Sequence, residues 1–132
     1  MSRDRGSNEF TTPDRAKAHD ALMPLLEAMF REFQDLAKKK PDAVLNKPKV
    51  ALANRLLVSV FEVLDAEPTR PYLDLLNEDE LPQYSDVVLM LGQTVAAMEA
   101  FRERYHGYLE EELRHGWAVA EASKKKTRRS PQ

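Results

Sequence analysis

The stretch SDVVLMLGQTVAAMEAFRERYHGYLEEELRHGWAVAEA, residues 85–122, decides the fold that the sequence predicts. It contains no proline, and an apolar residue recurs every three or four positions. On an α-helix this spacing places the following side chains on one stripe about 120° wide: Val87, Leu91, Val95, Met98, Phe101, Tyr105, Leu109 and Leu113. We therefore expect one long C-terminal helix, against which the rest of the chain packs.

The expected C-terminal helix changes character after its first half. Up to Phe101 its only formal charges are Asp86 and Glu99, whereas the residues beyond Arg102 are strongly charged. An unbroken helix to Ala122 would be about 57 Å long at 1.5 Å per residue, so its distal half would have fewer partners within the chain. Two glycines at positions 107 and 116, each costing up to about 1 kcal/mol in a helix interior, leave a break there open.

Two further helices are expected before this one. Thr12 followed by Pro13 predicts a helix start, and an apolar face continues to Lys40, where Pro41 ends the helix. Pro24 lies inside this pattern, so the helix either kinks there or ends and restarts. Asn46 predicts the cap of the next helix, which extends from Pro48 to Leu64 with a broad apolar face.

The remaining connection, residues 67–81, contains two prolines and fits one or two helical turns. Ser85 is expected to cap the last helix, with Asp86 favourably placed at its amino-terminal dipole. No alternating strand pattern and no internal repeat is visible. The fold class that follows is all-α: a single-domain bundle of about four helices, with a long C-terminal helix.

Length and composition set the broad class. At 132 residues we expect a flexible arm at 1–12, a helical bundle at 13–122 and a disordered basic tail at 123–132. The absence of cysteine excludes disulfides and thiolate metal sites and fits a reducing compartment. No signal peptide and no apolar run long enough to cross a bilayer occurs, so a soluble, cytoplasmic protein without membrane contact is expected.

Charge is unevenly distributed along the chain. The tail holds five of the 20 lysines and arginines and none of the 22 acids, so residues 1–123 carry a net charge of −7. Residues 62–86 alone also sum to −7, whereas residues 38–49 sum to +4. Such polarity favours oriented packing or oriented association.

The distal half of the last helix is the first candidate site. It would present an aromatic-rich apolar strip of the residue types that are enriched at protein interfaces, namely Phe101, Tyr105, Tyr108, Leu109, Leu113 and Trp117. Another protein, or a second copy of this chain, could cover the strip. Alternatively, the first helix covers it internally and the strip is core.

The basic segments suggest a second candidate, contact with nucleic acid. Clustered cations displace counterions from phosphates and give salt-sensitive, sequence-independent affinity. The residues concerned are Lys38, Lys39, Lys40, Lys47, Lys49, Lys124, Lys125, Lys126, Arg128 and Arg129. The net negative charge of residues 1–123 would repel nucleic acid and so opposes this hypothesis. No helix-turn-helix or zinc-finger pattern accompanies the clusters.

Enzymatic signatures are weak. Two Glu-x-x-His spacings, Glu103 with His106 and Glu112 with His115, resemble the ligand pairs of carboxylate-bridged metal bundles, but on one straight helix the two histidines lie on opposite faces. His19 beside Asp20 is expected to be exposed or locally hydrogen-bonded. No nucleophile elbow, phosphate-binding glycine loop or calcium loop is present.

We therefore expect no enzyme activity, metal or cofactor. The function that follows is a non-enzymatic interaction subunit, an adaptor, accessory or inhibitory partner in a cytosolic assembly, which docks through the distal half of the last helix. The alternative is an accessory protein that contacts nucleic acid through residues 38–49 and the basic tail.

Overall fold

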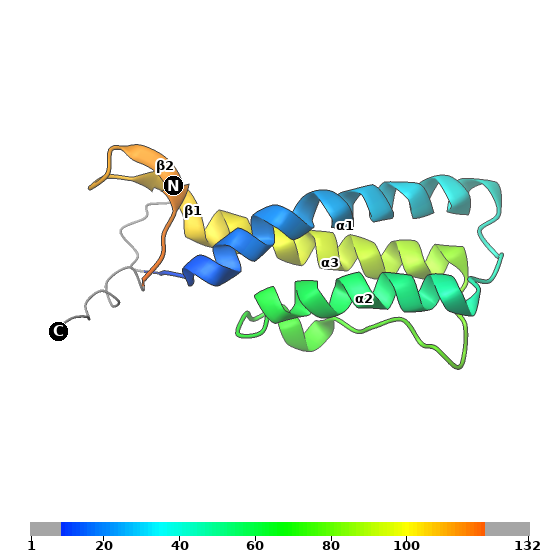
Figure 1. Cartoon of the computed structure of the whole chain (residues 1–132). Coiled ribbons are helices and arrows are strands. Elements are labelled where there is room, and N and C mark those ends of the chain that lie inside the picture. Colours follow the sequence, from blue (N-terminus) through cyan, green and yellow to red (C-terminus); the bar gives the residue numbers. More distant parts are fainter. Residues whose placement is uncertain (1–8, 121–132) are drawn as a thin grey trace.

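The computed structural model describes residues 9–120 and shows three helices with a short hairpin at one end (Figure 1). The helices are α1 (Pro13–Lys39), α2 (Lys47–Val63) and α3 (Tyr84–Tyr105), with one turn of 3₁₀ helix, η2 (Arg70–Tyr72), between α2 and α3. Strands β1 (His106–Leu109) and β2 (Arg114–Trp117) form the hairpin. The expectation of a predominantly helical protein is confirmed.

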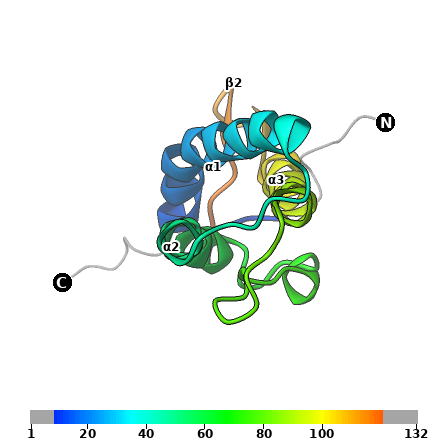
Figure 2. The same ribbon diagram turned by 90° about the vertical axis from the view of Figure 1, so that its right-hand side faces the viewer.

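The three helices enclose one hydrophobic core. Viewed end-on, they occupy three sides of the molecule, and the connection from α2 to α3 passes along the remaining side (Figure 2). Each helix contributes fully buried side chains, such as Leu26 on α1, Leu57 on α2 and Leu91 on α3. The connection adds Leu73 and Leu76, so it takes the place that a fourth helix would have in a bundle.

A buried asparagine holds this connection in place. The Asn54 side chain accepts a hydrogen bond from the Leu76 amide at 2.8 Å and donates one to the Leu76 carbonyl at 2.9 Å. Extended backbone that packs on a core must satisfy its polar groups, and Asn54 does so from α2. The segment therefore packs closely without helical structure.

The predicted helix boundaries before the C-terminal region are largely confirmed. Thr12 and Asn46 cap α1 and α2 by accepting hydrogen bonds from the Arg15 and Lys49 amides at 3.1 and 2.9 Å. α1 continues through Pro24 without ending there. Ser85 as a cap is wrong: α3 begins one residue earlier, after Gln83, whose amide donates to the Asp86 carboxylate.

The C-terminal helix does not run to Ala122, so of the two possibilities left open the break near the glycines is the one found, and the predominantly helical fold carries a small two-stranded sheet. α3 ends at Tyr105, and a β-hairpin follows in place of the distal half. Gly107 and Gly116 lie directly opposite each other in that hairpin. Glycine costs helix stability, and an overhanging helix would leave its apolar stripe uncovered, whereas folding back lets Trp117 return to the helices.

The count of about four helices is also wrong for the described residues. The structure has three α-helices, and the fourth side of the core is covered by the connection that contains η2. This segment carries three prolines at 68, 71 and 82, which interrupt a continuous helix. Of the one or two helical turns expected there, one is present as η2.

The two described ends of the chain meet beside the hairpin. Thr11 pairs with Val119 in a parallel bridge, in which the Thr11 amide donates to the Ala118 carbonyl and the Ala120 amide donates to the Thr11 carbonyl. Thr11 is buried. The remainder of the expected N-terminal arm, residues 1–8, and the basic tail from residue 123 lie outside the described residues.

Candidate docking site

The hairpin projects beyond the ends of the helices (Figure 1). β1 continues directly from α3, and the two strands pair in the antiparallel register His106 with Trp117 through Leu109 with Arg114. The Ala118 amide extends the ladder by donating to the Tyr105 carbonyl at 2.7 Å. The hairpin is therefore joined to the bundle at its base through the last residue of α3.

One face of the hairpin is aromatic. Side chains alternate between the two faces of a strand, so His106 and Tyr108 share a face with their cross-strand partners Trp117 and His115. The ring centroids of His106 and Trp117 lie 5.1 Å apart, and those of Tyr108 and His115 lie 5.3 Å apart. These edge-to-face pairs stabilise the two strands against each other.

The tip of the hairpin is a turn of residues 110–113. Amides of the turn bond three residues back, Glu112 to Leu109 at 3.1 Å and Leu113 to Glu110 at 3.3 Å. Leu113 has φ 54° and is the one non-glycine residue with positive φ in the described part of the chain. Its side chain is 78% exposed. A leucine in this conformation costs about 1 kcal/mol or more relative to glycine, and here no buried contact offsets that cost.

The base of the hairpin is enclosed by the helices. Trp117 packs against His19 of α1 and Phe101 of α3, with ring centroids 5.1 and 5.8 Å away. Its indole Nε1 donates to the Asp20 carboxylate at 3.1 Å. His19 itself is 2% exposed, so the expectation that it is exposed or only locally hydrogen-bonded is wrong. Its Nε2 lies 2.8 Å from the carbonyl oxygen of Met98 on α3.

A polar network supports α3 where it meets β1. The Tyr105 hydroxyl donates to the Glu67 carboxylate at 2.8 Å, and Arg104 donates to the other Glu67 oxygen at 3.3 Å. Arg104 also contacts Glu9, with N–O distances of 3.2 and 3.4 Å. Burial, followed by the bond to Glu67, raises the pKa of Tyr105 to about 12. The bond to Glu9 raises the pKa of Arg104.

The six residues predicted to form a partner interface separate into two groups. Phe101, Tyr105 and Trp117 lie at the base, where the chain's own helices cover the first two almost completely. Tyr108 is 43% exposed, Leu109 is partly exposed and Leu113 is largely exposed, and all three lie beyond the helices. The strip that one straight helix would have presented therefore does not exist as a continuous surface.

The described lysines of the predicted nucleic-acid site gather at the opposite end of the molecule. Lys38 and Lys39 lie in the last turn of α1 and Lys40 follows it, while Lys47 and Lys49 lie in the first turn of α2. All five are exposed. Ala120, the last described residue, lies at the hairpin end, and the tail cations from Lys124 to Arg129 lie outside the described residues.

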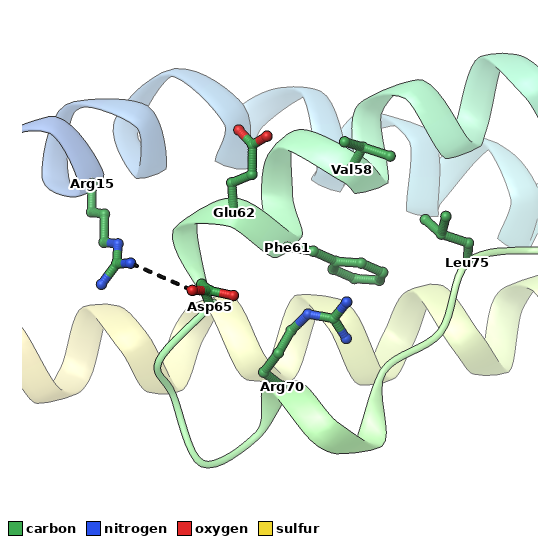
Figure 3. Close-up of a pocket in the computed structure, with 7 residues that line it drawn as sticks. All are labelled: Arg15, Val58, Phe61, Glu62, Asp65, Arg70 and Leu75. Atoms are coloured by element: carbon green, nitrogen blue, oxygen red, sulfur yellow. Dashed lines mark ion pairs between the residues drawn. The ribbon is translucent and has the colours of Figure 1, made fainter.

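A surface hollow of about 530 Å³ lies between the start of α1, the end of α2 and η2 (Figure 3). The Arg70 guanidinium covers the Phe61 ring at 4.3 Å and donates to the Leu73 carbonyl at 2.8 Å. Arg15 faces Asp65 at 4.0 Å. Two guanidinium groups and two carboxylates line the hollow, so it presents no excess of either charge and no histidine or hydroxyl group.

The histidine and acid spacings do not gather into a metal-binding group. In residues 9–120 no cluster of three or more histidine and acidic side chains is placed to hold a metal ion. His106 lies at the base of the hairpin and His115 farther out, next to Tyr108. None of the described helices has the length and apolar character needed to cross a membrane.

Comparison of the chain with protein-family models, curated proteins and solved structures found no match. The proposal below therefore rests on the geometry of the chain's own residues.

Three residues that hold the fold together, two at the hairpin base and one on α2, were not found from the sequence. Glu67 and Asn54 lie in unremarkable polar positions of the sequence, and their roles follow from contacts with residues 22 or more positions away. The burial of His19 could have been inferred from the sequence, because His19 lies one helical turn before Leu22 on the apolar side of α1. A histidine on such a face is often a buried hydrogen-bonding residue.

Proposed function

We propose that this chain is a non-enzymatic interaction subunit of a cytosolic assembly, which docks through the tip of its hairpin. The observation that carries the proposal is Leu113, an exposed leucine held in a left-handed backbone conformation. Both features cost free energy in the isolated chain, and neither contributes to its core. A partner that buries Leu113 would recover about 1.5 to 3 kcal/mol from the apolar surface alone.

The chemistry around Leu113 indicates the kind of partner. Glu110, Glu111 and Glu112 precede it in the same turn and are exposed, and one of them, Glu112, is paired with Arg114. Tyr108 adds an exposed aromatic ring on the same hairpin. The complementary surface is another protein with an apolar pocket for Leu113 and lysines or arginines at its rim, since opposite charges orient docking and raise the association rate.

The test is capture of partners from the native host with the full chain and two matched variants. Leu113→Gly removes the exposed side chain at a position where glycine is favoured, and Leu25→Ala removes a leucine of comparable exposure on α1, which is 57% exposed. We expect a protein that is retained by the wild type and by Leu25→Ala but lost with Leu113→Gly. Equal retention by all three would remove the proposal.

Two further measurements sharpen the test: one with the charge beside Leu113 changed, and one of the mass of the purified chain. Replacing Glu110 and Glu111 with glutamine should slow association with the captured partner and reduce its salt dependence, because two unpaired acids at the rim are lost. Sedimentation of the purified chain over a range of concentrations should give the monomer mass. A doubling of mass that Leu113→Gly abolishes would show that the partner is a second copy instead.

The clustered lysines favour a second candidate, contact with nucleic acid. Five exposed lysines from the end of α1 and the start of α2 form one basic end, and Lys47 borders a hollow of about 290 Å³ whose lining also includes the acidic Glu78. Changing Lys38, Lys39 and Lys47 to glutamine should then weaken DNA or RNA binding and flatten its dependence on salt. No binding at low salt would remove this candidate.

A further inference from the structure

The buried histidine at the base of the hairpin has a defined protonation state. Its Nε2 lies 2.8 Å from the Met98 carbonyl oxygen, which can only accept, so Nε2 carries the hydrogen. In the neutral ring Nδ1 is then a bare acceptor. Nδ1 is buried and has no hydrogen-bond partner among the described residues. A proton added to the ring would therefore have to sit on a buried nitrogen that has no hydrogen-bond acceptor among the described residues.

Aromatic rings surround His19 on two sides. Phe101 of α3 stacks on it at 5.4 Å with the planes 14° apart, and Trp117 of β2 contacts it edge-on at 5.1 Å. These rings exclude water, which disfavours an imidazolium. His19 thus places one buried ring of α1 in contact with both α3 and the hairpin.

The charged groups around His19 do not compensate for burial. On α1 Asp20 and Glu27 favour its charged form, whereas Arg102 of α3 opposes it. The pKa of the neighbouring His106 of β1 is likewise lowered, first by burial and then by Arg102. Burial remains the largest effect and lowers the pKa of His19 below its ordinary value of 6.5.

We propose that His19 is a proton-operated latch: neutral, it holds Trp117 and the hairpin base against α1, and protonated, it releases them. The released state lets the imidazolium reach water, so acid favours it. Between pH 6.5 and the lower pKa of the closed state, each unit of acidification raises the ratio of released to closed molecules about tenfold. Above pH 6.5 the closed state is fully favoured.

Release would also enlarge the surface available to a partner. Phe101 is buried and Trp117 partly buried in the closed state, and both residues, which the sequence indicated as interface, would become more accessible. This consequence rests on the docking function proposed above, whereas the latch itself does not. The two are separated by measuring the latch on the purified chain without a partner.

The first experiment follows Trp117, the only tryptophan of the chain, by fluorescence between pH 8 and pH 5. We expect its emission to shift to longer wavelength on acidification while far-ultraviolet circular dichroism still reports helices. His19→Gln should abolish the shift, because the amide nitrogen of glutamine can replace Nε2 but cannot titrate. His115→Gln, which changes the histidine that faces Tyr108, should retain it.

If His19→Gln does not fold, a second experiment on the wild type still tests the latch. Nuclear magnetic resonance of the wild type should give His19 a pKa below 6.5, with the Trp117 indole signal changing over the same range. The proposal is overturned if Trp117 shows no transition above pH 5, if the transition persists in folded His19→Gln, or if His19 titrates at or above 6.5. Simultaneous loss of all helical signal would also overturn it, because acid would then be unfolding the chain as a whole.

Discussion

The two ends of the hairpin differ in what holds them. At the base, Trp117 is packed between His19 and Phe101 and its indole nitrogen donates to Asp20. At the tip, Leu113 is exposed and its backbone adopts a conformation that glycine would adopt more readily. Only three residues, 114–116, separate Leu113 from Trp117. The base therefore belongs to the fold, and the tip is the part that we propose docks on a partner.

The largest effect is expected from the base. Phe101→Ala removes a ring that is 1% exposed and that contacts His19, Tyr105 and Trp117, so we expect a loss of about 3–5 kcal/mol in the free energy of unfolding. Tyr108→Ala, the matched change on the exposed part of the hairpin, should cost less than about 1 kcal/mol. Chemical denaturation of both variants measures the difference, and equal losses would erase the distinction between base and tip.

The buried hydroxyl at the base predicts a loss of stability in alkali. The folded chain holds the Tyr105 proton up to about pH 12, whereas the unfolded chain releases it near pH 10. The stabilisation is therefore complete below pH 10 and declines from there to about pH 12, by about 2–3 kcal/mol.

Tyr105→Phe is the control for the alkaline loss. It should lower stability by about 1–3 kcal/mol at neutral pH, because Glu67 loses a buried donor, and should remove this part of the alkaline decline. Tyr108→Phe should change neither quantity. Denaturation of the three proteins at pH 8 and pH 11 provides the comparison, and parallel pH profiles for wild type and Tyr105→Phe would contradict it.

A smaller effect is expected midway along the hairpin. A methyl group added at Gly116 would meet the guanidinium of Arg114, the far end of a flexible and exposed side chain, and would lie 3.5 Å from Leu109. Gly116→Ala should therefore change the free energy of unfolding by less than about 1 kcal/mol. A melting measurement that showed a much larger loss would mean that the strands are held as rigidly here as at the base.

Much of the helical part could be predicted from the sequence, because its signals are local. A capping residue followed by proline, as at Thr12 and Asn46, acts within one turn, and the apolar period marks the buried face. Ser85 was one residue away from the true start. The fourth side of the core could not be predicted in the same way, since it depends on Asn54 reaching Leu76 from another element.

The sequence did not predict the hairpin, because the spacing of its apolar residues fits a helix as well as a strand. Tyr105, Leu109 and Leu113 follow a helical spacing, and the strand pattern of His106–Leu109 is too short to stand out. Gly107 and Gly116 gave the local hint of a break. What decided the outcome was the contact of Trp117 with His19 nearly one hundred positions earlier, which no local pattern contains.

The central claim, that the hairpin tip is shaped for a partner and not for the fold, is tested most directly by the free energy of unfolding of Leu113→Gly. We predict a value within about 1 kcal/mol of the wild type, because relief of the left-handed backbone offsets the greater freedom of glycine in the unfolded chain. The same variant should lose the captured partner. A destabilisation of 2 kcal/mol or more would contradict the claim, since Leu113 would then be serving the fold.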